Sequence, residues 1–196
     1  RIKDKISGDE GSKKHLSIIN NQIFEISKLV NSFSEFARMP KPIFEKNDLL
    51  EIVNSSFETY QLNYEKIKFI FKNFLINTEI YCDKGQINRA LLNIYKNAIE
   101  SIEEKSGDVL LDGEITTELS EDKKFYFISI YDDGVGFKDS GNFKHNDPYF
   151  TTKKDGSGLG LSIVSKIVHE HNGQIFYENR KKENGALVSI TIPKKI

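Results

Sequence analysis

The run Asp-Asp-Gly-Val-Gly at residues 132–136 and the run Gly-Ser-Gly-Leu-Gly-Leu at residues 156–161 flank a polar, weakly patterned segment. Glycines let a backbone approach a ligand closely and adopt positive φ angles that other residues avoid. The second run leads into an apolar-periodic stretch that predicts a helix, and the unpaired N–H groups of a helix N-terminus attract phosphate. Either run alone would be weak evidence, but together they predict a nucleotide pocket with a lid between them.

Length, charge and cysteine content limit which architectures and which partners are possible for the chain. The chain has 196 residues, 38% of them hydrophobic, which suits one well-buried core and a smaller appendage. Its 28 basic and 29 acidic residues give a net charge of -1, so we expect no nucleic-acid partner. The single Cys82 is expected to be a buried structural thiol in a reducing, cytoplasmic compartment. No apolar run approaches the roughly 18 residues of a membrane span, so this stretch of chain is expected to be soluble.

A heptad-like seam marks the N-terminal part of the chain, after residues 1–11, which are expected to be a loop or frayed end. Its apolar residues step by three and four: Leu16, Ile19, Ile23, Ile26, Val30, Phe33 and Ala37. The seam predicts a long helix over about 13–39 that packs in a bundle with another helix and another subunit. Prolines at positions 40 and 42 end this helix. We therefore expect a bundle segment over residues 1–40 and a second domain over residues 41–196.

Helical and extended patterns follow one another through the second domain. Helices are predicted over about 48–62, from 83 to beyond 102, and over 158–171, with Asp48 and Asp83 as caps of the first two. Strands are predicted over 67–74, 78–82, 109–119, 124–132, 174–179 and 186–192. This order favours an α+β fold, a two-layer α/β sandwich in which helices cover one face of a mixed sheet.

Two asparagines, Asn93 and Asn97, lie four residues apart on the central predicted helix and therefore share one face. An amide oxygen is hard enough for Mg²⁺ and adds no negative charge that would repel a triphosphate. An isolated pair of this kind more often faces solvent or ties a helix to a loop. Beside the two glycine runs, a metal site at Asn97 is the better interpretation. Lys96, between them, either reaches a phosphate or is solvated.

Asp132 ends the strand predicted over 124–132 and shares its face with Tyr126, Ile128 and Ile130. Its carboxylate therefore enters an apolar environment and needs a hydrogen-bond donor. Asp133 points to the other face, where capping a nearby turn suits it better.

These runs, with Asn-Ile-Tyr-Lys-Asn-Ala at residues 93–98, resemble the ATP-binding domain of sensor histidine kinases, in the clan that includes gyrase, Hsp90 and MutL. The resemblance covers residues from about 13 to 196 and implies a Bergerat-type fold with ATP and Mg²⁺ as cofactors. It implies that Asn97 coordinates the Mg²⁺ bridging the phosphates. It also implies that Asp132 accepts a hydrogen bond from the adenine amino group, while Gly134 and Gly136 turn the backbone beneath the base.

The segment Asp-Pro-Tyr-Phe-Thr-Thr-Lys at residues 147–153 resembles the F-box of this family. The resemblance implies that Phe150 anchors the lid on the core and that Thr152 approaches the phosphates. Lys153 neutralises charge as the γ-phosphate moves, or is a solvated lid charge. Backbone N–H groups that cradle phosphate are expected from Gly156, Gly158, Leu159 and Gly160.

Asn93 occupies the place of a glutamate in the ATP-hydrolysing members and the serine-directed kinases of the clan. Water or a hydroxyl must lose a proton as it attacks phosphorus, and an amide cannot accept that proton. A neutral imidazole already presents a lone pair, so Asn93 fits transfer to histidine better than hydrolysis. We therefore expect a protein histidine kinase with Asn93 and Lys153 as its catalytic residues.

None of the four histidines is followed by the motif Glu/Asp-x-x-Asn-Pro, which follows the phosphoacceptor histidine in this family. His15 is expected at the surface, and His145 lies in the lid. His169 and His171 suit a helix C-terminus, where a partly protonated imidazole meets the negative end of the dipole. The phosphoacceptor helix is thus expected upstream of Arg1, and this chain alone is not expected to autophosphorylate.

The run Phe-Ser-Glu-Phe-Ala-Arg-Met-Pro-Lys-Pro at residues 33–42 resembles the end of the dimerisation hairpin in NtrY-like, nitrogen-regulation sensor kinases. This narrower resemblance implies a homodimer that passes the phosphoryl group to an aspartate of a response-regulator receiver domain. It also implies attachment to the inner face of a bacterial membrane through segments outside this chain. Two alternatives stay open: an ATPase of the same clan, and an ATP-binding regulatory or scaffold module without phosphotransfer.

Overall fold

The computed structural model of the chain describes residues 10–107, 112–137, 159–180 and 184–194. The helices are α1 (Glu10–Ala37), α2 (Leu49–Asn63), α3 (Lys84–Ser106) and α4 (Gly160–Glu170). The strands are β1 (Glu45–Asp48), β2 (Ile67–Asn73), β3 (Glu79–Cys82), β4 (Gly113–Glu121), β5 (Phe125–Asp132), β6 (Gln174–Asn179) and β7 (Ala186–Pro193). Each element predicted from the sequence is present, with ends that differ by a few residues. Strand β1 was not predicted, because its Glu-Lys-Asn-Asp sequence has no apolar alternation.

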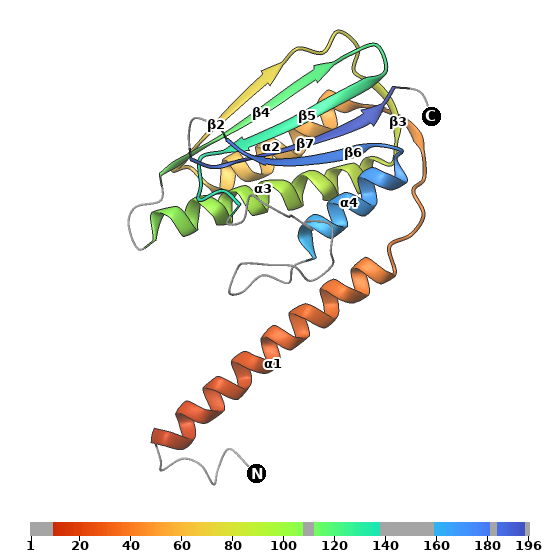
Figure 1. Ribbon diagram of the computed structural model, residues 1–196. Coiled ribbons are helices and arrows are strands. Elements are labelled where there is room, and N and C mark those ends of the chain that lie inside the picture. Colours follow the sequence, from red (N-terminus) through yellow and green to blue (C-terminus); the bar gives the residue numbers. More distant parts are fainter. Residues whose placement is uncertain (1–9, 108–111, 138–158, 181–183, 195–196) are drawn as a thin grey trace.

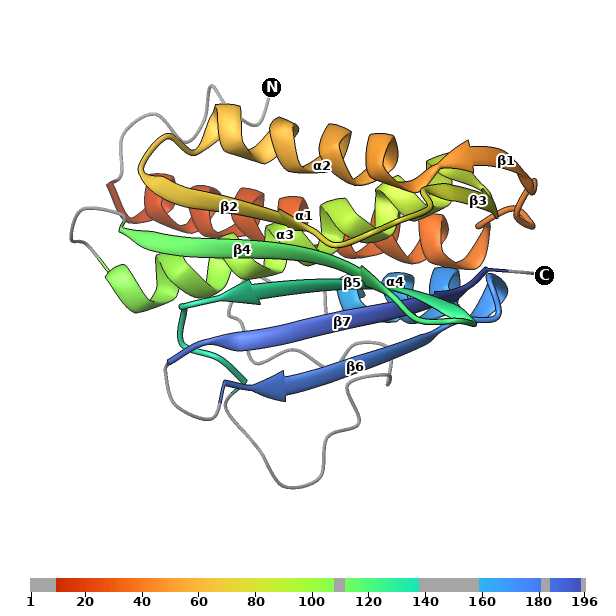
Figure 2. The same cartoon turned by 90° about the horizontal axis from the view of Figure 1, so that it is seen from above.

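Five strands form one mixed sheet in the order β2-β4-β5-β7-β6, which Figure 2 shows side by side. Strands β2 and β4 run parallel, and the other neighbours are antiparallel. Helices α2, α3 and α4 lie against one face of this sheet, whereas β1 and β3 pair separately at one end (Figure 1). The predicted two-layer α/β sandwich is confirmed.

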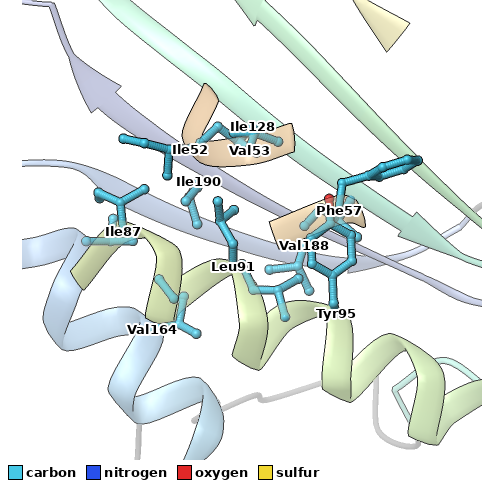
Figure 3. Packing of buried hydrophobic residues seen from close by; sticks show 14 of the residues in the cluster. Ile52, Val53, Phe57, Ile87, Leu91, Tyr95, Ile128, Val164, Val188 and Ile190 are labelled. Atoms are coloured by element: carbon cyan, nitrogen blue, oxygen red, sulfur yellow. The ribbon is translucent and has the colours of Figure 1, made fainter. Parts of the chain in front are cut away.

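The core lies between the sheet and the three helices. Alternate residues of β5 are buried, as the period of two predicts, and they include Asp132 at the end of the strand. Cys82 is fully buried, and burial raises the pKa of its thiol to about 11, so the thiol stays protonated at neutral pH. Figure 3 shows the labelled core side chains converging from both layers: Ile52, Val53, Phe57, Ile87, Leu91, Tyr95, Ile128, Val164, Val188 and Ile190.

Asp48 and Asp83 cap the N-termini of α2 and α3, as the sequence predicted. Asp48 Oδ1 accepts the N–H of Glu51 at 3.0 Å, and Asp83 Oδ1 accepts the N–H of Gln86 at 3.0 Å. Each cap satisfies an N–H group that has no partner within its helix. The cap at Asp83 therefore fixes where α3 starts, and with it the positions of the polar residues farther along this helix.

His171 ties the end of α4 to the start of α3. Its ring is buried, and Nε2 accepts the N–H of Asp83 at 3.1 Å while Nδ1 donates to the carbonyl oxygen of Ile167 at 2.8 Å. An Nε2 atom that accepts a hydrogen bond carries no proton, so the imidazole is neutral. The expectation of a partly protonated imidazole was therefore wrong for His171, because the ring packs inside the domain rather than at an exposed helix end.

The segment between α1 and β1 rests on the same corner of the domain. The N–H of Ile43 donates to Asp83 Oδ2 at 2.9 Å, and the Gln86 side chain donates to the carbonyl oxygen of Pro40 at 2.9 Å. The ring of Phe44 lies 5.0 Å from the ring of His171. These contacts connect the segment after α1 to both α3 and α4.

Helix α1 extends away from the sandwich (Figure 1). It starts at Glu10, inside the stretch expected to be a loop, and ends at Ala37, just before the prolines. Its seam residues Ile19, Ile23 and Val30 are between 52% and 57% exposed. Within the described ranges, no helix is both long enough and apolar enough to cross a membrane.

Candidate functional site

A polar stripe runs along α3. Asn93, Asn97 and Ser101 follow one another at intervals of four residues, which gathers them on one side of the helix. At a rise of 1.5 Å per residue the stripe is about 12 Å long. Other sides of α3 are buried in the core, so the helix cannot rotate without exposing apolar surface. Core packing thus fixes the direction in which the stripe points.

The N-terminus of α4 lies beside the first two residues of this stripe. A Cβ atom added to Gly160 would lie 3.5 Å from Asn93 Oδ1 and 3.7 Å from both Oδ1 and Nδ2 of Asn97. Nδ2 of Asn93 donates to the carbonyl oxygen of Arg89 at 2.8 Å, so Oδ1 is the atom that approaches α4. Among the described residues no side chain caps α4, and Leu159 is buried in the core. This end of the site combines amide oxygens with the N–H groups of a helix start.

Asp132 lies at the other end of the site, where β5 ends. Its Oδ1 accepts the N–H of Gly134 at 2.9 Å and the N–H of Ala186 at 3.4 Å. Burial raises the pKa of the carboxyl to about 6, although the two N–H groups favour the charged form and oppose this shift. Asp132 is therefore a buried hydrogen-bond acceptor, as its place on the strand predicted. Its carboxyl is mostly ionised at pH 7.

Asp133 points away from the site, as expected, but its carboxylate bonds to β4 and α3 and does not cap a turn. One carboxyl oxygen accepts the N–H of Glu114 at 2.8 Å, and the other lies 2.9 Å from Lys105 Nζ. These bonds attach the end of β5 to the start of β4 and to the last turn of α3. Asp133 thus supports the turn that follows β5. Of the two aspartates, only Asp132 points into the site.

The two glycines after Asp133 serve different purposes. A Cβ atom on Gly134 would lie 2.3 Å from Ser101 Oγ, so glycine is needed because the loop passes directly over α3. Gly136 has a φ of +70°, a backbone conformation that side chains disfavour. Both lie beside Asp132, as expected, although the contact between Gly134 and Ser101 could not be seen in the sequence.

Gly185 immediately precedes β7, lies against Asp132 and was not singled out from the sequence. Its φ is +111°, and a Cβ atom there would lie 2.0 Å from the carbonyl oxygen of Asp132. Arg180 Nη1 donates to the same carbonyl oxygen at 3.3 Å. The only signal in the sequence is a glycine just before the last strand, which is also typical of an ordinary turn.

Replacing Gly185 with alanine is expected to lower the free energy of unfolding by on the order of 3 kcal/mol, because the new Cβ must displace the backbone of Asp132 and hold a strained φ. ATP affinity should fall in parallel. Gly85→Ala is a matched control in the first turn of α3, where the added Cβ meets only Asp83 Oδ1 at 3.4 Å. The free energy of unfolding of that variant should rise by about 0.5–1 kcal/mol. Equal urea midpoints for Gly185→Ala and the unmodified chain would contradict this account.

The remaining predicted site residues lie outside the described residues. They are Phe150, Thr152, Lys153, Gly156 and Gly158. The described residues of the predicted set are Asn93, Asn97, Asp132, Gly134, Gly136, Leu159 and Gly160. Gly160 lies beside the two asparagines and Gly134 lies against α3, whereas Gly136 lies against Asn179 and Gly185.

The α/β sandwich carries the Asn93 and Asn97 amides beside the start of α4, and it carries the buried Asp132 at the end of β5. These features together define an ATP-binding domain of a recognised class. The family of histidine kinase-, DNA gyrase B-, and HSP90-like ATPases matches residues 82–196. The chain belongs to this family.

Among its members the chain is similar to sensor histidine kinases. A putative NtrY-like sensor histidine kinase of Rickettsia felis is 34% identical over 97% of this chain and 31% of its own length. The chain therefore spans about a third of this curated relative. The catalytic domain of the histidine kinase ThkA matches 78% of this chain and 96% of that domain, with 30% identity and a TM-score of 0.67. ThkA in complex with the response regulator protein TrrA matches 99% of this chain and 56% of that chain, with 26% identity and a TM-score of 0.74.

Proposed function

We propose that the chain is the catalytic part of a two-component sensor histidine kinase, which moves the γ-phosphoryl group of ATP to a histidine on a helix outside the chain. From there the group passes to an aspartate of a response regulator. The observation that carries the proposal is the α3 stripe, with two amides beside the start of α4 at one end and Asp132 at the other. One elongated ligand, with phosphates at the first end and a base at the second, fits both.

At the base end, Asp132 would accept a hydrogen bond from the adenine amino group. The carboxylate keeps acceptor capacity for this bond, because Oδ1 alone receives the two N–H groups of the protein. Guanine presents a carbonyl oxygen at the same place, which a carboxylate repels. This contrast favours ATP over GTP.

At the phosphate end, the donor set fits Mg²⁺. The amide oxygen of Asn97 is a hard, uncharged ligand near the N–H groups of α4, which attract phosphate. Mg²⁺ held here would supply positive charge that neutralises the phosphates. We propose Asn97 as its protein ligand.

The proposed transfer to histidine rests on Asn93. Its oxygen faces α4, but an amide cannot take a proton from attacking water. An imidazole nitrogen needs no such base, because it attacks with a lone pair. We propose that Asn93 orients the reacting groups and that Lys153 neutralises charge on the phosphoryl group.

The partners follow from α1 and from the relatives. We propose that residues 1–40 belong to a dimerisation hairpin, because the seam of α1 stays about half exposed in a single chain. ThkA has been crystallised with a response regulator, which supports a receiver domain as the second partner. The similarity to an NtrY-like sensor supports a cytoplasmic location as part of a membrane-attached protein.

The test is to mix the chain with a separate hairpin that carries a phosphoacceptor histidine, then add γ-³²P-ATP and Mg²⁺. The proposal predicts acid-labile label on the hairpin and none on a hairpin whose histidine is replaced by glutamine. ATP binding without label would favour a regulatory or scaffold module. Release of phosphate without label would favour an ATPase.

A further inference from the structure

Ser101 is a buried polar residue at the base end of the site whose hydroxyl makes no well-formed hydrogen bond to any other described residue. The residue is 8% exposed, and Oγ is inaccessible to solvent. An unsatisfied buried hydroxyl destabilises a protein, so its presence needs a reason. Its place on the α3 stripe, four residues after Asn97, suggests one.

Two neighbours show where this hydroxyl lies. It is next to Gly134, since a Cβ atom there would come within 2.3 Å of Oγ. It is also near Asp132, because Ser101 lowers the pKa of that carboxyl and partly opposes the effect of burial. This effect is that of a weak hydrogen bond, because no described group meets the full distance and angle requirements for one with the Ser101 hydroxyl.

We propose that Ser101 is a second base-reading residue, whose hydroxyl donates to the ring nitrogen N1 of adenine while Asp132 accepts from the neighbouring amino group. The inference rests on the proposed function, since it assumes ATP in this site. On the adenine edge the amino group is a hydrogen-bond donor, and the neighbouring N1 is an acceptor. A carboxylate beside a hydroxyl offers the complementary acceptor and donor. Guanine carries a carbonyl oxygen where adenine has its amino group, so the contact to Asp132 would be lost, whereas the hydroxyl would have to turn and accept the N1–H.

The experiment is a cycle of two proteins and two ligands. The unmodified chain and Ser101→Ala are each titrated calorimetrically with ATP and with 1-deaza-ATP, in which N1 is replaced by C–H. We expect the unmodified chain to bind 1-deaza-ATP about tenfold more weakly than ATP. Ser101→Ala should bind ATP about tenfold more weakly and lose nothing further with 1-deaza-ATP. Ser101→Cys keeps the side-chain size and should resemble the alanine variant.

Other outcomes separate the possible failures. If Ser101→Ala binds ATP as tightly as the unmodified chain, the inference is wrong. If it loses the same factor for both ligands, the hydroxyl acts through Asp132 rather than on N1, and direct reading is again overturned. If the unmodified chain binds no ATP, the proposed function itself fails.

A stability measurement distinguishes base reading from a structural role. At pH 4 Asp132 is protonated and no longer benefits from the neighbouring hydroxyl, so Ser101→Ala should unfold there at the same urea concentration as the unmodified chain or a higher one. Ser56 on α2 is the matched control. It is also buried, but its hydroxyl lies 2.6 Å from Asn88 Oδ1 and bonds to the carbonyl oxygen of Ile52. Ser56→Ala should lower stability and leave ATP affinity unchanged. A clear loss of stability in Ser101→Ala at pH 4 would show a structural role instead.

Discussion

Replacing Asp132 with asparagine should abolish ATP binding and make the folded chain more stable at pH 7. The amide carbonyl can still accept the N–H groups of Gly134 and Ala186, so the loop should keep its conformation. The amide NH₂ group, however, replaces an acceptor with a donor that opposes the adenine amino group. Because both partners are then left unpaired in a buried site, we expect ATP affinity to fall by at least about 100-fold.

The gain in stability follows from the linkage between protonation and folding. Burial raises the pKa of Asp132 to about 6, above the value of 3.8 for an ordinary aspartate. Between these two pH values the folded chain binds more protons here than the unfolded chain, so its stability falls as the pH rises. The loss approaches about 3 kcal/mol above pH 6. Asparagine has no ionised form to desolvate and avoids this loss.

Urea unfolding of both proteins from pH 4 to pH 7 measures this difference. The free energies of unfolding should agree near pH 4, and the variant should become more stable by up to about 3 kcal/mol at pH 7. Asp133→Asn is the matched control, because the neighbouring carboxyl lies outside the site and contacts Lys105 and Glu114. It should keep ATP binding. Destabilisation of Asp132→Asn at pH 7 would mean that the carboxylate is held by interactions stronger than those described.

Replacing Asn97 with alanine should remove the magnesium dependence of ATP binding and reduce phosphotransfer to the hairpin by at least about 100-fold. The variant loses the amide oxygen proposed as the Mg²⁺ ligand, so the charge on the transferred group is no longer neutralised in a fixed geometry. Titrations with ATP in the presence and absence of Mg²⁺, followed by the labelling assay, measure both effects.

Lys96→Ala is the control for this variant. Lys96 neighbours Asn97 in sequence, but its side chain is 66% exposed and lies 3.8 Å from Glu100. The structure therefore favours the solvated alternative for Lys96, and we expect unchanged binding and transfer. If Asn97→Ala retains magnesium-dependent binding, the metal ligand lies elsewhere.

Features set by local chemistry were predictable from the sequence. Asp48 and Asp83 cap helices because an aspartate before an apolar-periodic run has little other local use. The burial of Asp132 followed from the period of two along β5. In both cases neighbours within a few residues decide the result.

Features set by contacts between distant segments were not predictable. His171 and Asp83 are 88 residues apart, and nothing near either residue indicates their hydrogen bond. Gly185 resembles an ordinary turn glycine until β7 brings it against Asp132. Ser101 resembles a neutral helix residue until the loop at Gly134 covers it. Tertiary packing creates these environments, and a single sequence does not specify which segments meet.

Calorimetric titration of the unmodified chain with ATP, with and without Mg²⁺, tests most directly whether the α3 stripe and Asp132 form an ATP site. We expect saturable binding with a dissociation constant on the order of 10–100 μM in Mg²⁺, weaker binding when the ion is chelated, and still weaker binding of GTP. Absence of saturable heat at millimolar ATP and Mg²⁺, or equal affinity for ATP and GTP, would contradict this account.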